Sequence, residues 1–180
     1  RDVAMVFQNY GLYPTMTVRE NIRFPLKVRG VPRDQHDAMV HRAAEMVELG
    51  DLLDRLPNVL SGGQRQRVAL ARVFVTLPKV LLMDEPFGAL DAQTRVAMHE
   101  ILLRIWEAHR TTVLFVTHDV DEALILSDRA HIMSAGPGRI IETMDVTQER
   151  PRHVDNIGPD FLKARNHIIR LLRQPGAEDH

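Results

Sequence analysis

The stretch Val80-Leu81-Leu82-Met83-Asp84-Glu85-Pro86 decides the fold class, because four apolar residues lead directly into two acidic ones. A short apolar run of this kind is typical of a strand in a parallel sheet that is covered on both faces. Ligands of open α/β sheets bind at the carboxyl ends of the strands, where Asp84 and Glu85 stand. Such a pair can orient a hydrated Mg²⁺ through Asp84 and accept a proton from water through Glu85. The alternative is an exposed turn after a buried strand.

Short apolar segments alternate with helical patterns along the rest of the chain, which indicates parallel βαβ units buried on both faces. The further strands that we predict are Val3–Phe7, Thr112–Val116 and Ala130–Met133. A helix over Asp91–His109, capped by Asp91, precedes the second of these. Its apolar positions are Val96, Ile101, Leu102 and Ile105. Near the C-terminus, Gly136-Pro137-Gly138 predicts the turn of a hairpin and Asp160–Arg173 a helix.

Between the first strand and Val80 the chain reads as mostly helical. A capping box over Thr17–Glu20 starts one helix, and we expect Pro25 to end or kink it. A second helix, over Asp34–Leu49, has one apolar face. That face carries Ala38, Met39, Ala43, Met46 and Val47. With a third helix over Arg65–Val75, the sequence predicts an α/β fold in which a helical subdomain is inserted into a core sheet.

The composition excludes several classes of protein. A chain of 180 residues with 44% apolar and 26% charged residues can fold as one domain or as a domain with a small subdomain. Basic and acidic residues, 23 and 24, leave a net charge of -1, which gives no electrostatic footprint for nucleic acid. Cysteine is absent and no two of the nine histidines have zinc-protease spacing, so a disulfide framework, a thiol nucleophile and a zinc enzyme are not expected. The apolar runs fall far short of the roughly 20 residues that span a bilayer.

A second informative stretch, Leu60-Ser61-Gly62-Gly63-Gln64, stands directly before the third predicted helix. Glycines let backbone N–H groups approach a phosphate closely, and a helix N-terminus attracts anions. The Ser61 hydroxyl can add a hydrogen bond to the phosphate. The alternative is a capping box formed by Ser61 and Gln64. Capping alone does not require two glycines, which favours an anion site.

Five motifs in this order resemble the second half of an ATP-binding cassette (ABC) ATPase, the nucleotide-binding subunit of ABC transporters. The resemblance covers roughly the first 135 residues. The matching segments are Gln8 for the Q-loop glutamine, Leu60–Gln64 for the signature motif, Val80–Glu85 for the Walker B strand, Ala89–Asp91 for the D-loop and His118 for the switch histidine. It implies a P-loop NTPase-type core sheet that uses ATP and Mg²⁺.

The resemblance also implies the role of each site residue. Glu85 and His118 are the catalytic pair, in which His118 contacts the γ-phosphate; Gln8 and Asp84 hold the metal. The residues implied to bind nucleotide are Gln8, Ser61, Gly62, Gly63, Gln64 and Asp91. The implied segments are residues 1–9 (core strand and Q-loop), 10–77 (helical subdomain with the signature motif), 78–135 (ATPase core) and 136–180 (C-terminal hairpin and helix).

The partners that the resemblance implies are a second ATPase subunit, a transmembrane permease and, indirectly, an external solute-binding protein. Two subunits would close head to tail on two ATP molecules, with Ser61 on the γ-phosphate held by the other subunit. The loop from Asn9 to Pro14, with Tyr10 and Tyr13, would receive the permease, unless these tyrosines only cover the core. The protein would then be peripheral on the cytoplasmic face of the inner membrane. No nucleic acid partner is expected.

The lysine-bearing phosphate loop G-x-x-x-x-G-K-[ST] does not occur in these 180 residues. In the family this Walker A loop precedes the Q-loop, and the present sequence begins inside a strand-like run at Val3. We therefore expect the sequence to be a fragment that lacks the Walker A portion. By itself it should bind ATP weakly and show no steady hydrolysis.

The type of transporter is indicated by two stretches that disagree. Residues 6–27 resemble importers of sugars and polyamines, whereas residues 127–140 and 91–95 resemble the nitrate, sulfonate and taurine group. The sequence has no room for the large C-terminal domain of sugar-type subunits, which favours the nitrate/sulfonate/taurine type. A non-transport ABC ATPase and a non-enzymatic interaction module are the remaining alternatives.

Overall fold

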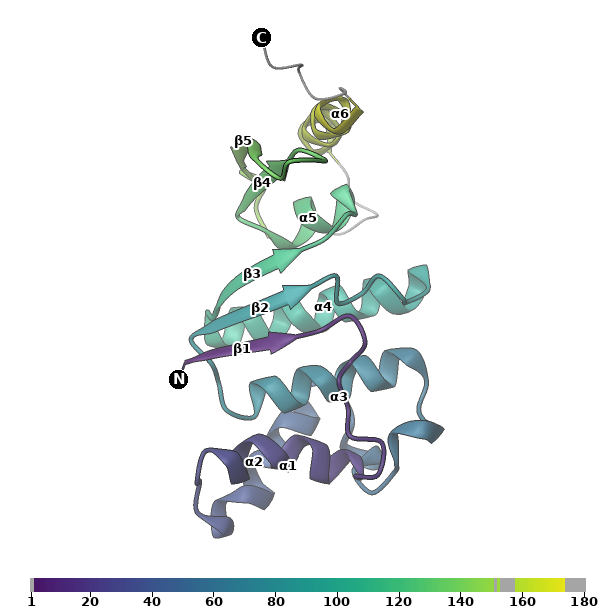
Figure 1. The fold of residues 1–180 in the computed structure, drawn as a ribbon, viewed down its shortest axis with the longest axis vertical. Helices are drawn as coiled ribbons and strands as arrows, with labels where there is room; N and C mark the ends of the chain where they lie inside the picture. Colours follow the sequence, from purple (N-terminus) through teal and green to yellow (C-terminus); the bar gives the residue numbers. More distant parts are fainter. Residues whose placement is uncertain (1, 151, 153–157, 174–180) are drawn as a thin grey trace. The chain divides into compact units, whose positions relative to one another are not determined.

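The computed structural model describes residues 2–150, 152 and 158–173, and the chain divides into two compact units, 1–116 and 117–180. Figure 1 shows the order of the elements along the chain. The first unit contains a sheet and a group of helices that follows its first strand. The second contains a short helix, a hairpin and a further helix.

The sheet of the first unit consists of the parallel strands β1 (Val3–Val6), β2 (Val80–Asp84) and β3 (Thr112–Val116), in that order across the sheet. All three predicted strands are present, and β2 extends one residue further than predicted. Asp84 is therefore the last residue of a central strand, paired in register with Val116. The carboxyl ends of the three strands lie along one edge of the sheet, which confirms the parallel arrangement on which the predicted site depends.

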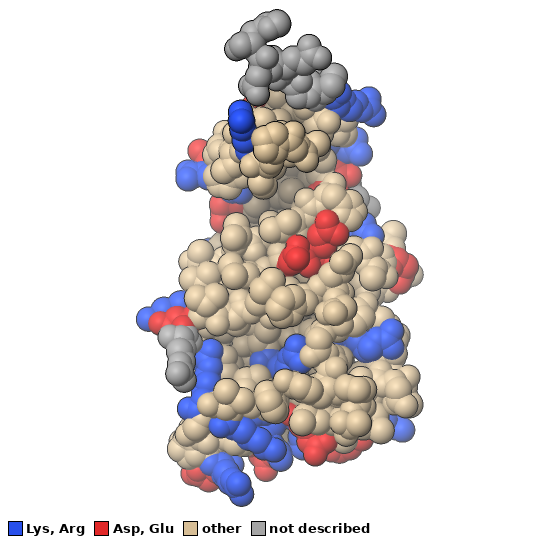
Figure 2. Space-filling model, viewed as in Figure 1, with Lys and Arg blue, Asp and Glu red and all other residues tan. Residues whose placement is uncertain are grey.

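Only one face of this sheet is buried, so the prediction of strands covered on both faces is wrong for the first unit. Leu81 and Met83 on β2 are almost completely buried. Alternate positions on the opposite face are exposed, with Met5 on β1 at 38%, Leu114 on β3 at 57% and Val116 at 50%. Helix α4 lies behind the strands in the view of Figure 1, and Figure 2 shows mostly uncharged atoms over the strands in front. Because the covering helices lie on one side, the other side of the sheet remains uncovered in the part described.

The helices of the first unit are α1 (Val18–Val28), α2 (Arg33–Met46), α3 (Gly62–Phe74) and α4 (Ala92–His109), with 3₁₀ turns η1 (Gly50–Leu52) and η2 (Pro57–Val59) between α2 and α3. The predicted capping box at Thr17 and Glu20 starts α1. The helix does not end at Pro25 but continues to Val28. Its apolar residues Ile22 and Leu26 are completely buried, and this packing outweighs the loss of one backbone hydrogen bond at proline.

Two predicted apolar faces are rotated in the structure. On α2, Ala38 is exposed and His36 is buried, because the imidazole Nε2 lies 2.9 Å from the Val31 carbonyl oxygen and satisfies that polar atom inside the core. On α4, Val96 is 40% exposed, whereas Met98 and His99 are buried. In both helices, a histidine occupies a core position that a pattern of apolar residues cannot reveal.

The second unit consists of α5 (Val120–Leu126), the antiparallel hairpin of β4 (Arg129–Met133) and β5 (Ile140–Asp145), and α6 (Pro159–Arg173). The predicted turn connects the two strands, with a cis peptide bond between Gly136 and Pro137. We predicted Ala130–Met133 as a strand of the parallel sheet; in the part of the chain described, this segment pairs with β5 alone. A connection as short as this turn allows only antiparallel pairing.

Candidate functional site

The carboxyl edge of the sheet brings Gln8 and Glu85 together. Gln8 follows β1, and Glu85 follows β2 directly. A Cβ atom at Gly88 would lie 3.6 Å from the Gln8 side-chain nitrogen and 3.8 Å from Glu85 Oε2, so both side chains reach the same glycine. Asp84 is exposed at the same edge. The three polar side chains that the sequence predicted for this edge therefore stand at the ends of adjacent strands.

Glu85 has an unusual backbone conformation. Its φ is 42°, in the left-handed region, and its N–H donates to the Val116 carbonyl of β3 at 2.9 Å. This conformation costs a residue with a Cβ roughly 1–2 kcal/mol, which surrounding contacts must offset. Strain of this kind collects at functional sites, because the structure is selected for the direction of the side chain rather than for local stability. The half-buried Glu85 is thus held by backbone geometry beside Gln8.

Ser61 is the N-cap of α3. Its hydroxyl oxygen accepts a hydrogen bond from the Gln64 N–H at 3.2 Å, and Gln64 Oε1 accepts from the Ser61 N–H at 2.9 Å. The capping box that we considered as the alternative is therefore present. It leaves the Ser61 hydroxyl hydrogen available to donate, and Ser61 is exposed at the N-terminus of a 13-residue helix. The capping box and an anion site are compatible in this geometry.

The two glycines of the signature motif have different surroundings. A Cβ at Gly63 would lie closer than 3.0 Å to Thr94 Cγ2 of α4, so Gly63 is required for the close approach of α3 and α4. A Cβ at Gly62 would meet Leu90 and Tyr10 only at 3.6 Å, an ordinary contact. Packing therefore explains Gly63, which corrects the inference that both glycines indicate a phosphate. Packing does not explain Gly62.

Asp91 caps α4 as predicted. Its Oδ1 accepts from the Thr94 N–H at 3.0 Å, and its Oδ2 accepts from the Thr94 hydroxyl at 2.6 Å. These hydrogen bonds hold the pKa of the Asp91 carboxyl below its ordinary value. Thr94 thus touches the position of Gly63 with its methyl group and Asp91 with its hydroxyl, which connects the signature motif to the D-loop.

A hollow of about 340 Å³ opens between the N-terminal turns of α3 and α4. It is lined by Ser61, Gly63, Gln64, Arg67, Gln93, Thr94 and Ala97. Two helix N-termini, each with partial positive charge, meet at this hollow, which therefore favours a negatively charged group.

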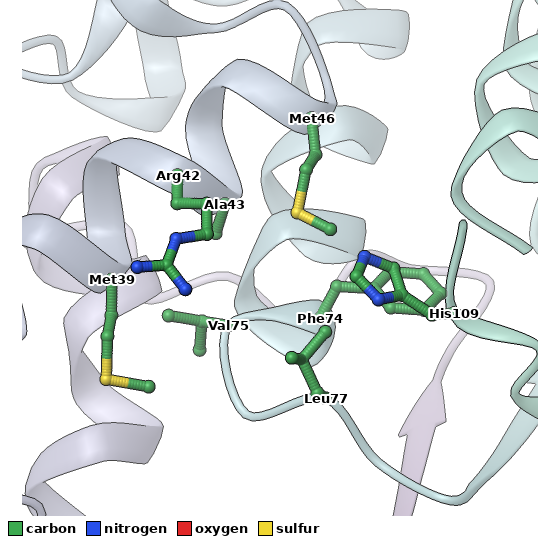
Figure 3. Close-up of a pocket in the computed structure, with 8 residues that line it drawn as sticks. All are labelled: Met39, Arg42, Ala43, Met46, Phe74, Val75, Leu77 and His109. Carbon is green, nitrogen blue, oxygen red and sulfur yellow. The ribbon is translucent and has the colours of Figure 1, made fainter.

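A smaller pocket of about 90 Å³ lies elsewhere in the first unit, among α2, the end of α3 and the end of α4 (Figure 3). Its lining residues are Met39, Arg42, Ala43, Met46, Phe74, Val75, Leu77 and His109. None of them belongs to the predicted site.

His118 belongs to the second unit, where it is exposed immediately before α5. Asp119 caps that helix by accepting hydrogen bonds from the N–H groups of Asp121 and Glu122 at 2.9 and 3.1 Å. Within each unit, then, the structure groups the predicted residues as follows. Gln8, Asp84 and Glu85 share the edge of the sheet, and Ser61–Gln64 and Asp91 meet through Thr94.

The residues at the edge of the sheet fit a magnesium ion that is shared with a nucleotide. Asp84 offers a carboxylate and Gln8 an amide oxygen, and Mg²⁺ in nucleotide sites needs only one or two protein ligands beside phosphates and waters. Among residues 2–150, 152 and 158–173, no cluster of three or more histidine or acidic side chains could hold a metal without such help. In the same part of the chain, every helix is too short or too polar to cross a lipid bilayer.

Sequence reasoning missed Thr94 and Arg72. Thr94 has a recognisable signal, since it is the third residue after a capping aspartate. Arg72 of α3 donates from Nη1 to the Gly11 carbonyl and from Nη2 to the Tyr10 carbonyl, the latter at 3.1 Å. No spacing in the sequence connects residues about sixty positions apart.

Comparison with known proteins agrees with these motifs. The family model described as ABC transporter matches residues 1–88. An uncharacterized ABC transporter ATP-binding protein of Methanocaldococcus jannaschii is 45% identical over 172 residues, which cover 96% of this chain and 64% of that protein. The trehalose/maltose import ATP-binding protein MalK of Thermococcus litoralis is 48% identical over 179 residues, covering 99% of this chain and 48% of the relative.

The nitrate import ATP-binding protein NrtD of Synechocystis is 40% identical over 185 residues, covering 99% of this chain and 70% of that protein. Among solved structures, CbiO1 of Clostridium perfringens, part of the ABC transporter complex CbiONQ, matches with a TM-score of 0.67 and 29% identity, over 72% of this chain and 52% of CbiO1. The chain spans less than two thirds of the archaeal relative, so the comparison concerns a part of the longer proteins. The parallel α/β sheet, the ordered motifs and these similarities together show that the chain belongs to the family of ABC transporter ATP-binding proteins.

Proposed function

We propose that the protein is the ATP-hydrolysing subunit of an ABC importer, peripheral on the cytoplasmic face of the membrane. The observation that carries this proposal is the meeting of Gln8 and Glu85 at the carboxyl edge of the sheet, where both reach Gly88. An amide and a carboxylate at the ends of adjacent parallel strands suit a triphosphate site with a metal ion. Family membership supports the same activity.

The residues at this edge have separate tasks in the proposed reaction. Asp84 and Gln8 hold Mg²⁺ through their side-chain oxygens. When bound, the ion neutralises charge on the phosphate oxygens. Glu85 accepts the proton of the attacking water at a carboxylate oxygen, and its left-handed backbone fixes the direction of that carboxylate. His118 donates a hydrogen bond to the γ-phosphate.

The signature motif binds the triphosphate held by a second subunit. Ser61 donates its hydroxyl hydrogen to a phosphate oxygen, and the first N–H groups of α3 point toward the same anion. Gly62, whose lack of a side chain is not needed for packing, lets the phosphate approach the helix. Asp91 takes part through the D-loop, tied to Gly63 by Thr94. A homodimer that closes on ATP follows from this arrangement.

The lysine-bearing phosphate loop belongs, in this proposal, to the part of the whole protein that packs on the uncovered face of β1, β2 and β3. Exposed Val3, Met5 and Leu114 form an apolar surface there. A parallel sheet is normally covered by helices on both faces, and a helix that follows the phosphate loop suits this position.

The cargo that we propose is of the nitrate, sulfonate or taurine type, because residues 127–140 and 91–95 resemble that group and a relative imports nitrate. The alternative is a sugar importer, which the 48% identity to a trehalose/maltose import protein favours. A permease and an external solute-binding protein would determine the cargo in either case. The permease would dock near Tyr13, whose ring is 38% exposed.

Substitution of Glu85 tests the proposed activity. In the full-length protein, Glu85→Gln should reduce Mg²⁺-dependent ATP hydrolysis by about 10²- to 10⁴-fold, because the amide cannot accept the proton. ATP binding should persist, and ATP-bound dimers should accumulate in size-exclusion chromatography. Glu48→Gln is the matched control, since Glu48 is also a glutamate with left-handed φ, here 58°. Wild-type turnover in Glu85→Gln would contradict the proposal.

Substitution of Ser61 tests the dimer. Ser61→Arg should weaken ATP-driven dimerisation and leave ATP binding by the same subunit intact, because the hydroxyl contacts the other subunit's nucleotide. Asn58→Arg, at an exposed position of η2, adds the same charge nearby and should leave dimerisation unchanged. Equal dimerisation of Ser61→Arg and Asn58→Arg would remove the signature motif from the interface.

A further inference from the structure

The loop that follows Gln8 is wound tightly. The Tyr10 N–H donates to the Phe7 carbonyl at 3.2 Å, and the Gly11 N–H donates to the Asn9 carbonyl at 2.7 Å. Tyr10 and Gly11 both have left-handed backbones, with φ of 61° and 55°. For Tyr10 this conformation costs roughly 1–2 kcal/mol. Contacts from outside the loop must therefore hold it in place.

Arg72 of α3 makes those contacts. Its guanidinium donates to the carbonyl oxygens of both left-handed residues, Tyr10 and Gly11. The Arg72 Cζ also lies 5.9 Å from the centre of the Tyr13 ring. A guanidinium presents its donors in a fixed planar fork, so one side chain can fix the orientation of two consecutive peptide groups.

The loop is also attached at its other positions. Arg65, in the second turn of α3, lies with its Cζ 5.8 Å from the centre of the Tyr10 ring, and the Tyr10 hydroxyl lies 3.6 Å from the Cβ position of Gly62. On α1, the buried Asn21 amide accepts from the Tyr13 N–H at 2.9 Å. The loop thus contacts both ends of the helix that begins with the signature motif.

We propose that Arg72 is a positioning residue for Gln8. By fixing the carbonyls of Tyr10 and Gly11 on α3, it makes the glutamine loop and the signature helix move as one body, so that Gln8 stays beside Glu85 only in the arrangement of α3 that the loop senses. This inference deepens the proposed function and rests on it. Arg72 touches neither nucleotide nor metal in this proposal and acts through the loop.

The test uses the full-length protein with Arg72→Met, Arg72→Lys and Gln8→Ala, alone and combined. Arg72→Met should lower kcat by roughly ten- to a hundredfold with a much smaller change in KM for MgATP, the scale expected of a misplaced catalytic group. Arg72→Lys, which keeps one donor for the loop carbonyls, should recover part of the rate. In the Gln8→Ala background, Arg72→Met should change kcat less than about twofold, because a positioning residue has no effect once its target is gone.

Arg23→Met is the matched control, because Arg23 of α1 pairs with the carboxylate of Asp37 and not with the loop. It should keep kcat within about twofold of wild type, the scale of a surface ion pair. Hydrogen exchange of residues 8–13 gives a readout that does not depend on activity, and Arg72→Met alone should accelerate it.

Two results would overturn the positioning role: unchanged exchange in Arg72→Met, or an equal loss of kcat from Arg72→Met with and without Gln8. An inactive wild-type protein would instead contradict the proposed function, and the exchange of residues 8–13 would then decide whether Arg72 holds the loop.

Discussion

Replacing Gly63 by alanine tests the packing of the signature helix against α4. The new Cβ would lie closer than 3.0 Å to Thr94 Cγ2, a distance that real Cβ contacts do not reach. Thr94 cannot rotate away without cost, because its hydroxyl donates to Asp91 Oδ2 at 2.6 Å. Either α3 shifts away from α4, or this hydrogen bond at the N-cap of α4 breaks.

The expected loss of stability follows from either route. Overpacking of a well-packed contact destabilises by about 1–3 kcal/mol. Breaking a hydrogen bond to a carboxylate has a similar effect at a buried site and a smaller one here, because Asp91 is exposed. We therefore expect Gly63→Ala to lower the free energy of unfolding by about 1–3 kcal/mol, or the midpoint of thermal unfolding by roughly 2–4 °C per kcal/mol.

Gly62→Ala is the matched control one residue earlier. Its Cβ would meet Leu90 and Tyr10 at the ordinary distance of 3.6 Å. The substitution should leave stability unchanged or raise it by up to about 1 kcal/mol, because alanine restricts the unfolded chain. If Gly62 serves the approach of a phosphate, the same variant should weaken ATP-driven dimerisation despite its stability.

The double variant Gly63→Ala/Thr94→Ser isolates the steric term. Serine removes the Cγ2 methyl group and keeps the hydroxyl that donates to Asp91. Stability should return to that of Thr94→Ser alone, as measured by urea unfolding followed by circular dichroism. If Gly63→Ala is as stable as Gly62→Ala, or if Thr94→Ser rescues nothing, then α3 and α4 are not in the close contact described here.

Three further predictions concern single residues. Asn21→Leu leaves the Tyr13 N–H and three carbonyls without their buried amide partner, so the free energy of unfolding should fall by at least about 2 kcal/mol; an unchanged urea midpoint would contradict this. Glu85→Gly relieves the left-handed strain, so thermal stability should be equal or higher while ATP hydrolysis is lost; a lower midpoint would show that the backbone is not strained. Because the folded pKa of Asp91 lies below its ordinary value of 3.8, its stabilising effect is complete above that pH and disappears as the pH falls through the lower folded value. Asp91→Asn, which keeps an N-cap, should therefore match the wild type in acid and be less stable at neutral pH, and unfolding curves at several pH values would show whether the two converge.

Much of the fold could be predicted because its signals are local. The strand that ends at Asp84, the capping boxes at Thr17 and Ser61, and the N-cap at Asp91 all depend on residues within one or two turns of one another. Their geometry follows from hydrogen bonds that a short segment can complete by itself. The motifs of the family are short and ordered for the same reason, so they could be recognised without a structure.

The errors arose where burial depends on distant elements. Apolar spacing misplaced the buried face of α2, because a histidine satisfied by a backbone carbonyl occupies the core at His36. Pro25 did not end α1, because burial of Leu26 outweighs one lost hydrogen bond. The sheet was expected to be covered on both faces, whereas which face has helices depends on the whole topology.

The sequence by itself determined the class of the fold, the family and the identity of the polar residues at the strand ends, since each depends on the order of residues along a short segment. Only the tertiary structure decided that Gln8 meets Glu85, that Gly63 is needed for contact with Thr94 and that Arg72 holds the loop at Tyr10. These contacts join residues about 30 to 80 positions apart, and the packing of helices on a twisted sheet, rather than any local preference, brings them together.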